Sequence, residues 1–344
     1  MFFPTIKKIE AAEFKRQLLC PFITSGFSLY SREGIIIRAT FCDETVTYGE
    51  ASPLAPFSLE KIGDVKSFLI EEKKNNWISA YAFGERKLLS SLAMAVDSIT
   101  YDYALSKNTN CISSLELNAV FSLGAGSLKK LRELYTLGYT TFKLKISPAN
   151  SVQTLSFLRA AYKEFKDSIK FRLDANASFP FVEAKKFLAA TAIFPLEYIE
   201  DILLPSNINQ YEELAENTKT PLALDMGLNT KAAIENAIEI PWTSFLILKP
   251  TACGGLLATQ SLLEKIQKKN KVAILTSLLE TEVGLRSLIN YSLPLNKGNY
   301  AYGFSTASIF AENFLPIPPN IKKPLSFNEN LSAWLRSLPW EAVC

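Results

Sequence analysis

Three acidic residues recur in this chain at a nearly constant interval, and each follows a short apolar run. Asp174, Glu200 and Asp225 lie 26 and 25 residues apart. An interval of this length holds one β-strand, one helix and the turns that join them. We therefore expect the three carboxylates to lie at the same end of successive parallel strands.

The same period extends well beyond the acidic residues. Stretches with apolar residues at intervals of three and four, such as SLKKLRELYTLG and FVEAKKFLAATAI, alternate with β-rich runs. Eight such runs begin near Leu117, Thr141, Lys170, Leu196, Pro221, Ser244, Lys271 and Gly298. Eight strand and helix units predict an α/β fold, a (β/α)8 barrel of the TIM type, with its site at the carboxyl ends of the strands.

The barrel does not account for the whole chain of 344 residues. Residues 1–115 contain alternating apolar runs near 34–39 and 46–50, which predict the antiparallel strands of an α+β capping domain. Residues 116–325 hold the barrel and its metal site. The tail, residues 326–344, is too short for a domain, and we expect it to pack back on the body and complete the capping domain.

Composition excludes several classes of function. Histidine is absent, so a Ser-His-Asp or Cys-His triad is impossible and any metal site must be built from oxygen ligands. Basic residues exceed acidic ones by only three, and like charges form no long runs, so neither nucleic acid nor a membrane is an expected partner.

The five cysteines are scattered and form no CxxC pair, which argues against a disulfide framework or a zinc site. The sequence shows no apolar segment of signal-peptide or membrane-spanning length, and we expect a cytoplasmic protein.

The carboxylates Asp174, Glu200 and Asp225 are candidate ligands for Mg²⁺, with Mn²⁺ as an alternative, because small hard cations take oxygen ligands. An acidic residue after a strand most often caps the next helix, and this is the alternative for each of them taken singly. The constant spacing favours a shared metal site.

Lysines accompany these carboxylates. Lys143 and Lys145 are two residues apart on a predicted strand and share one face, while Phe142 and Leu144 lie on the other. If the strand is buried, crowding of two ammonium groups should lower the pKa of one and make it a usable base. The alternative is an exposed edge strand with solvated lysines.

Lys249 follows an apolar run and precedes Pro250, so it is expected at another strand end. A lysine in this place could form a Schiff base with a carbonyl substrate. The neighbouring carboxylates favour metal-dependent chemistry instead.

These motifs resemble those of the enolase superfamily. They are Lys-Leu-Lys at 143–145, Asp-Ala-Asn at 174–176, Ile-Glu-Asp at 199–201, Leu-Ala-Leu-Asp at 222–225 and Leu-Lys-Pro at 248–250. Segments 32–34, 48–58, 276–284 and 303–306 extend the likeness over essentially the whole chain. Within the superfamily, the sequence is most similar to the o-succinylbenzoate synthase family of menaquinone biosynthesis.

The sequence departs from the superfamily pattern in two places. Asp225-Met226-Gly227 stands where Asp-Glu-Ser is usual, which puts in doubt any contact that the glutamate would make. The last strand lacks the Asp-x-Asp of dipeptide epimerases, which disfavours a dipeptide substrate.

The resemblance implies a metal-dependent dehydratase, a carbon-oxygen lyase acting on a small-molecule carboxylate, 2-succinyl-6-hydroxy-2,4-cyclohexadiene-1-carboxylate. The carboxylate trio would hold the metal and stabilise an enediolate. Lys145 would remove the α-proton and return it to the departing hydroxyl. Lys143 would hold the pKa of Lys145 down, and Lys249 would lie over the opposite face of the ring as an electrostatic clamp.

Candidates for substrate contact come from the barrel and from the cap. They are Arg172, Asn176, Ser277, Ser305, Thr306, Phe27 and Phe57. Arg172 could instead form an ion pair within the barrel, and the two phenylalanines could be ordinary packing between domains. Segments 24–29 and 52–58 of the cap are expected to close over the mouth.

Two alternatives remain open from sequence. An N-acylamino acid racemase has the same metal site and would use Lys145 and Lys249 as bases on opposite faces. A non-catalytic binding protein on a retained barrel is the second alternative, suggested by Met226. Oligomeric state, monomer or homo-oligomer, is not indicated.

Overall fold

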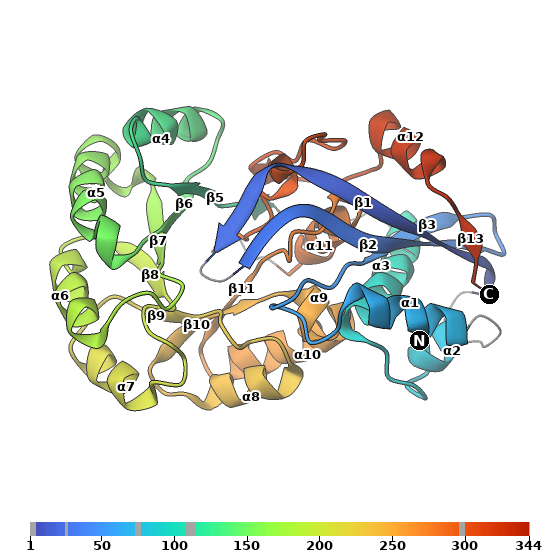
Figure 1. Cartoon of the computed structure of the whole chain (residues 1–344), viewed down its shortest axis with the longest axis horizontal. Coiled ribbons are helices and arrows are strands. Elements are labelled where there is room, and N and C mark those ends of the chain that lie inside the picture. The colour runs from blue at the N-terminus through green and yellow to red at the C-terminus, as the bar shows by residue number, and fades with distance from the viewer. Residues whose placement is uncertain (1–4, 25–26, 73–76, 108–113, 296–299, 344) are drawn as a thin grey trace.

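The structure, a computed structural model, describes residues 5–24, 27–72, 77–107, 114–295 and 300–343. A parallel sheet surrounded by helices occupies one half of the molecule, and a long antiparallel hairpin with helices packed beside it occupies the other (Figure 1).

Seven parallel strands form the barrel sheet in the order β11-β10-β9-β8-β7-β6-β5. Their bounds are β5 Ala119–Ser122, β6 Thr141–Lys145, β7 Lys170–Asp174, β8 Leu196–Glu200, β9 Leu222–Leu224, β10 Thr243–Leu248 and β11 Val272–Leu275. The helices between and after them are α4 Ser127–Thr136, α5 Ser151–Phe165, α6 Phe181–Thr191, α7 Ile208–Glu216, α8 Lys231–Glu239, α9 Pro250–Cys253, α10 Gly255–Lys268 and α11 Glu282–Ser292.

The ring is closed at the eighth position by short bridges. Leu117 pairs with Tyr302, and Thr276 pairs with Gly303, both in parallel. The Gly303 amide donates to the Leu275 carbonyl at 2.9 Å, so residues 302–303 join the two edges of the sheet. The expected start of this strand near Gly298 lies outside the described residues.

Strand β6 shows why the barrel forms from this sequence. It pairs with β5 on one side and β7 on the other, so the edge-strand alternative for its lysines is wrong. Phe142 and Leu144 are fully buried in the layer between strands and helices. Lys143 and Lys145 take the alternate positions and face the inside of the ring.

The capping domain is built on a four-stranded antiparallel sheet in the order β13-β1-β2-β3. Its elements are β1 Ile6–Thr24, β2 Phe27–Phe41, β3 Val46–Ala51, α1 Ile62–Glu71, α2 Trp77–Ala82 and α3 Ser90–Lys107. The short strands β4 Leu115–Glu116 and β12 Asn320–Ile321 pair with each other beside the barrel.

The C-terminal tail packs on the cap, as expected. It supplies α12 Glu329–Ser337 and β13 Glu341–Ala342. β13 pairs with β1, and Leu331 and Leu335 are buried in a cluster with Phe14. The predicted barrel with an α+β cap completed by the tail is confirmed, while its limits after residues 115 and 325 stay predictions.

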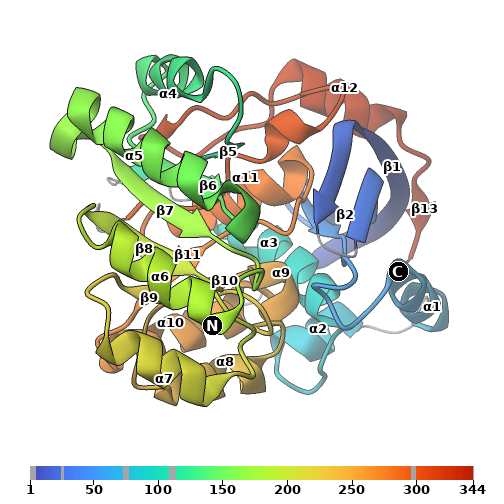
Figure 2. The ribbon, with the colours of Figure 1, turned by 60° about the vertical axis from the view of Figure 1, so that its left-hand side comes forward.

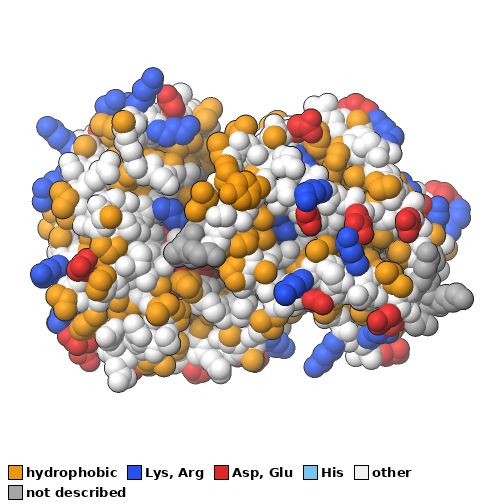
Figure 3. All heavy atoms as spheres, viewed as in Figure 1, with side chains coloured by type: hydrophobic (Ala, Val, Ile, Leu, Met, Phe, Trp, Pro, Cys, Tyr) orange, Lys and Arg blue, Asp and Glu red, His pale blue; other side chains and the backbone are white. Residues whose placement is uncertain are grey.

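The two halves meet at the barrel mouth. The β1–β2 hairpin reaches from the cap toward the barrel strands in both ribbon views (Figures 1 and 2). Apolar side chains gather on the surface near this meeting place (Figure 3). Beneath it, Leu54 of the cap packs with Ala252 and Leu278 of the barrel. No helix in the described part of the chain is long and apolar enough to cross a membrane.

Candidate active site

The parallel register brings the strand-end residues together. Lys145 pairs with Asp174, and Asp174 pairs with Glu200, as direct neighbours on β6, β7 and β8. Asp225 follows β9, and Lys249 follows β10. All these positions lie at carboxyl ends of strands, where a barrel carries its site.

Each carboxylate of the trio is paired with a lysine. Lys143 Nζ lies 2.9 Å from Asp174 Oδ2 and 2.7 Å from Glu200 Oε1. Lys145 Nζ donates to the same Asp174 oxygen at 2.6 Å and to Asn176 Oδ1 at 2.8 Å. Lys249 Nζ forms an ion pair with Asp225. Asp174 and Glu200 are buried, whereas the Lys145 side chain is 35% exposed and accessible to a ligand.

The carboxylates around Lys143 determine its charge state. The pKa of Lys143 moves upward, so Lys143 is not the lysine whose pKa crowding would lower. Burial opposes its charge, yet the Asp174 and Glu200 carboxylates outweigh burial and raise the Lys143 pKa well above its ordinary value.

The pKa values of Asp174 and Glu200 are shifted in opposite directions, although the two carboxylates share charged neighbours. Burial alone would raise the pKa of Asp174, but Lys143 and Lys145 hold it well below its usual range. For Glu200, burial and the nearby Asp174 charge prevail over Lys143 and raise the pKa to about 7.

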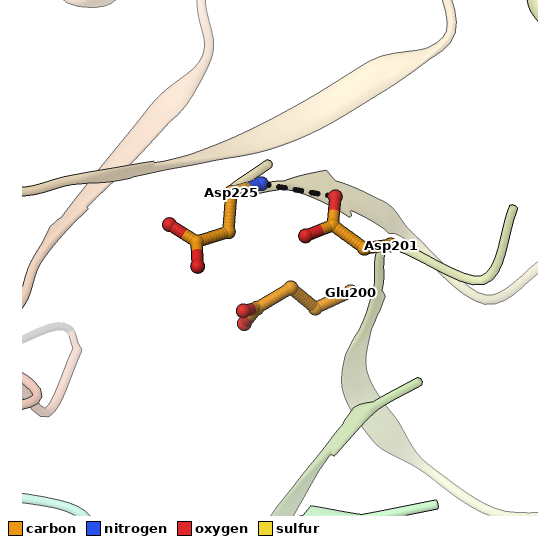
Figure 4. A group of neighbouring side chains, drawn as sticks. All are labelled: Glu200, Asp201 and Asp225. Carbon is orange, nitrogen blue, oxygen red and sulfur yellow. Dashed lines mark hydrogen bonds between the residues drawn. The ribbon is translucent and has the colours of Figure 1, made fainter. Parts of the chain in front are cut away.

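The acidic cluster fits a hard divalent cation. Glu200, Asp201 and Asp225 each offer a carboxylate oxygen within 4.8 Å of the others. The Glu200 and Asp225 carboxylates extend past that of Asp201 in the same direction (Figure 4). Glu200 Oε2 is buried without a hydrogen-bond partner among the described residues, and an all-oxygen donor set suits Mg²⁺ or Mn²⁺. Asp174 is not in this group, and its Oδ2 lies 2.9 Å from Lys143 Nζ and 2.6 Å from Lys145 Nζ.

Asp201 was not singled out from sequence. It is fully buried, its Oδ1 accepts the Asp225 amide at 3.1 Å, and its Oδ2 accepts the Met226 amide at 2.9 Å. Burial and the neighbouring charge of Asp225 raise its pKa well above the ordinary value. Asp201 thus fixes the backbone that carries Asp225. In the sequence, only its position directly after Glu200 indicates that Asp201 lies near the site.

A cavity of about 340 Å³ lies over these groups. Its wall includes Lys143, Lys145, Asp174, Asp225, Lys249, Leu54, Phe57, Ser277, Leu278, Leu279, Ser305 and Thr306. A second lobe of about 250 Å³ is lined by Phe27, Met226, Gly227, Leu228 and Asn229. The two lobes share Phe57, Asn176, Asp225 and Lys249.

The hydroxyl candidates lie together on the cavity wall. Ser277 Oγ and Thr306 Oγ1 are 2.8 Å apart. Ser305 Oγ is buried without a hydrogen-bond partner in the described part of the chain. The structure therefore brings these three predicted residues to one side of the cavity.

The aromatic candidates come from the cap. Phe27 and Phe57 form an edge-to-face pair with ring centroids 6.1 Å apart. Lys249 Nζ lies 5.7 Å from the centroid of Phe57, within cation–π range. Phe57 lines both lobes and Phe27 only the second.

Arg172 is placed differently from its expected role. Its side chain is fully buried and does not belong to the wall of either lobe. Arg172 Nε donates to Glu197 Oε2 at 2.6 Å, and Nη1 donates to Asn118 Oδ1 at 3.0 Å. The ion pair within the barrel, the alternative to substrate contact, is the arrangement observed.

Comparison with known proteins agrees with this architecture. Residues 127–287 match the family described as Enolase C-terminal domain-like. The o-succinylbenzoate synthase of Thermosynechococcus vestitus is 23% identical over 299 residues, which cover 85% of this chain and 90% of that protein. The N-succinylamino acid racemase of an Amycolatopsis species is 27% identical over 53% of this chain and 51% of its own length.

A solved structure shows the same fold. The o-succinylbenzoate synthase of Thermosynechococcus elongatus BP-1, complexed with Mg in its active site, superimposes with a TM-score of 0.75 at 20% identity. The match covers 96% of this chain and 98% of that one. The resemblance expected from the sequence motifs is confirmed.

Proposed function

Starting from a barrel of the enolase superfamily, we propose that this chain is a metal-dependent dehydratase. It would convert 2-succinyl-6-hydroxy-2,4-cyclohexadiene-1-carboxylate to o-succinylbenzoate in menaquinone biosynthesis. One observation carries the proposal: three lysines and three carboxylates converge at strand ends beneath a cavity of about 340 Å³, in a chain without histidine. The name of a relative that aligns with 85% of the chain, an o-succinylbenzoate synthase, supports it.

Glu200 and Asp225, whose carboxylate oxygens lie within 4.8 Å of each other, would hold the divalent cation. Asp174, the third carboxylate of the superfamily motif, would join them in exchange for one of its contacts with Lys143 and Lys145. Asp201 fixes the backbone at Asp225. A bound Mg²⁺ or Mn²⁺ would act as a Lewis acid on the substrate carboxylate and so make the neighbouring carbon more acidic.

Lys145 is the proposed base and acid. Its Nζ takes the α-proton, so the carbon–hydrogen bond breaks and the amine becomes an ammonium. The same ammonium then gives that proton to the departing hydroxyl, the carbon–oxygen bond breaks, and water leaves as the ring becomes aromatic. The accessible Nζ, held by Asp174 and Asn176, suits this double role.

The other two lysines have electrostatic roles. Lys143 contacts both Asp174 and Glu200, so it stays charged and offsets their negative charge. Lys249 borders the cavity beside Phe57 and would stabilise negative charge on the ring as the proton leaves. The hydroxyls of Ser277 and Thr306 are placed to accept or donate hydrogen bonds to the succinyl chain.

An N-acylamino acid racemase is the second candidate. Lys145 and Lys249 both line the main cavity, and the second lobe at Lys249 leaves room for another substituent on the reacting carbon. One relative is named N-succinylamino acid racemase, and this name supports the racemase candidate.

One experiment separates the candidates. The purified protein is incubated with the cyclohexadiene and Mg²⁺, and the aromatic product is followed by absorbance and mass spectrometry. A parallel incubation with each enantiomer of an N-succinylamino acid in D₂O measures deuterium exchange. Rapid aromatisation without exchange supports the dehydratase, exchange from both enantiomers without aromatisation supports the racemase, and neither reaction refutes both.

A further inference from the structure

The loop from β11 to α11 forms one wall of the cavity. Thr276, Ser277, Leu278 and Leu279 line it, and Leu54 of the cap packs against Leu278. The next two residues, Glu280 and Thr281, are buried and do not line the cavity, and Thr281 contacts Glu50 of the cap. The contacts at this junction between cap and barrel therefore determine the position of the wall residues Leu278 and Leu279.

Glu50, at the end of the cap strand β3, binds the start of α11. Its carboxylate accepts the Thr281 amide at 3.0 Å, the Thr281 hydroxyl at 2.5 Å and the Gly284 amide at 3.0 Å. The Ser52 hydroxyl donates to it at 2.6 Å. A carboxylate is favoured at this place because the first amides of a helix lack partners within the helix.

Gly284 leaves the room for this contact. A Cβ there would lie 2.7 Å from Glu280 Cβ and 3.0 Å from Glu50 Oε2. The absence of a side chain thus lets a cap carboxylate reach the helix start.

Arg32 binds the other side of the same loop. Its guanidinium donates to the Leu279 carbonyl at 3.1 Å and the Leu278 carbonyl at 3.3 Å. It also donates to the Pro53 carbonyl at 3.0 Å and to the Ser52 carbonyl. One fully enclosed side chain therefore joins the cap segment that carries Leu54 to the barrel loop that carries Leu278 and Leu279.

Glu280 extends the network toward the catalytic side. It accepts the Leu278 amide at 2.6 Å and the Thr251 hydroxyl, and Thr251 stands two residues after Lys249. Neither Arg32 nor Glu50 lines the cavity.

We propose that Arg32 and Glu50 are positioning residues that fix the Leu54 and Leu278–Leu279 wall, and so determine how the substrate side chain fits. This inference rests on the proposed dehydratase function. The network touches none of Lys145, Asp174 and Glu200, so its loss should weaken substrate binding and leave proton transfer and metal binding largely intact.

The test compares Glu50→Gln with the wild type. An amide nitrogen in place of one oxygen would face N–H and O–H donors, so at least one charge-assisted contact is lost. We expect KM for the diene and Kd for the product o-succinylbenzoate to rise about tenfold, the effect of losing one hydrogen bond to a charged group. kcat and the Mg²⁺ dissociation constant should each change less than about threefold, the size of effect expected for a substitution that does not touch the groups concerned.

Asp97→Asn is the matched control. Asp97 is also a buried cap carboxylate, and it binds a barrel helix start through the Leu257 amide at 2.9 Å, away from the cavity wall. This variant should keep the wild-type KM and Kd. An equal rise in KM for Asp97→Asn would show that any weakening of the junction suffices and would overturn the assignment.

The readouts separate failure of this inference from failure of the proposed function. A wild type that neither aromatises the diene nor binds the product refutes the dehydratase. A wild type that does both, with Glu50→Gln unchanged in KM and Kd, refutes the positioning role alone. If Glu50→Gln does not fold, Ser52→Ala replaces it. This variant removes only the hydroxyl that donates to Glu50. An unchanged KM for Ser52→Ala would then refute the positioning role.

Discussion

Replacement of Lys145 by alanine is the sharpest test of the proposed chemistry. The same Nζ serves as base and then as acid, and each role contributes roughly 10²–10⁴-fold to an enzymatic rate. Losing both should lower kcat by at least about 10⁴-fold, or about 5.4 kcal/mol of transition-state stabilisation.

The structure indicates that this loss would not come from unfolding or loss of metal. Lys145 donates to Asp174 Oδ2 at 2.6 Å, but Lys143 Nζ lies 2.9 Å from the same oxygen and remains in the variant. Because the Lys145 side chain is 35% exposed, we expect the free energy of unfolding to change by no more than about 1 kcal/mol.

The assay measures kcat by product absorbance, Mg²⁺ affinity by calorimetry and stability by urea unfolding. Lys170→Ala is the control. Lys170 lies at the start of β7, at the other end of the strand from Asp174, and its side chain is 54% exposed. Near-native turnover in Lys145→Ala, with the control also active, would refute the assignment of the base.

Three further predictions follow from the site and its surroundings. Exhaustive chelation should abolish turnover and added Mg²⁺ or Mn²⁺ should restore it; turnover that survives chelation contradicts the carboxylate site. Glu197→Gln should lower the free energy of unfolding by about 3–5 kcal/mol, since it leaves the buried Arg172 without its ion pair at 2.6 Å; a change below about 0.5 kcal/mol, typical of a surface substitution, would show that the pair is not needed. Burial raises the pKa of Asp97 to about 7, and a folded-state pKa above the unfolded one means that stability present at low pH is lost as the pH rises. The loss should be on the order of 4 kcal/mol between pH 4 and pH 8, and Asp97→Asn should flatten this profile in urea titrations; an unchanged profile would contradict it.

Much of the barrel could be predicted because its strands carry a clear local signal. β6, β7 and β8 begin at Thr141, Lys170 and Leu196, where the β-rich runs predict them. Apolar residues alternate with charged ones along β6 and β7, and this period of two is typical of a strand. The eighth strand is represented by bridges at Tyr302 and Gly303, where pairing depends on closure of the ring rather than on local sequence.

The strand-end residues were predictable for the same reason, but their partners were not. Spacing places Lys143 near the mouth, yet it does not reveal that Asp174 and Glu200 both contact its ammonium and raise its pKa. Periodicity likewise could not decide whether Arg172 meets substrate or Glu197, because that choice depends on the depth of its side chain in the barrel.

Contacts between segments that are distant in the sequence were the hardest to predict. Glu50 and Thr281 are 231 positions apart, and neither stands in a motif that predicts their contact. Asp201 binds the amides of Asp225 and Met226 across neighbouring strands, a link that only the register of β8 and β9 creates. Such contacts require the three-dimensional fold.

The rate of o-succinylbenzoate formation from the cyclohexadiene substrate tests the central claim most directly. With Mg²⁺ present, we predict that the purified wild-type protein forms the aromatic product with kcat/KM of at least about 10⁴ M⁻¹ s⁻¹, the lower end of the usual enzymatic range. Formation of product no faster than in a solution without protein would contradict the proposed dehydratase.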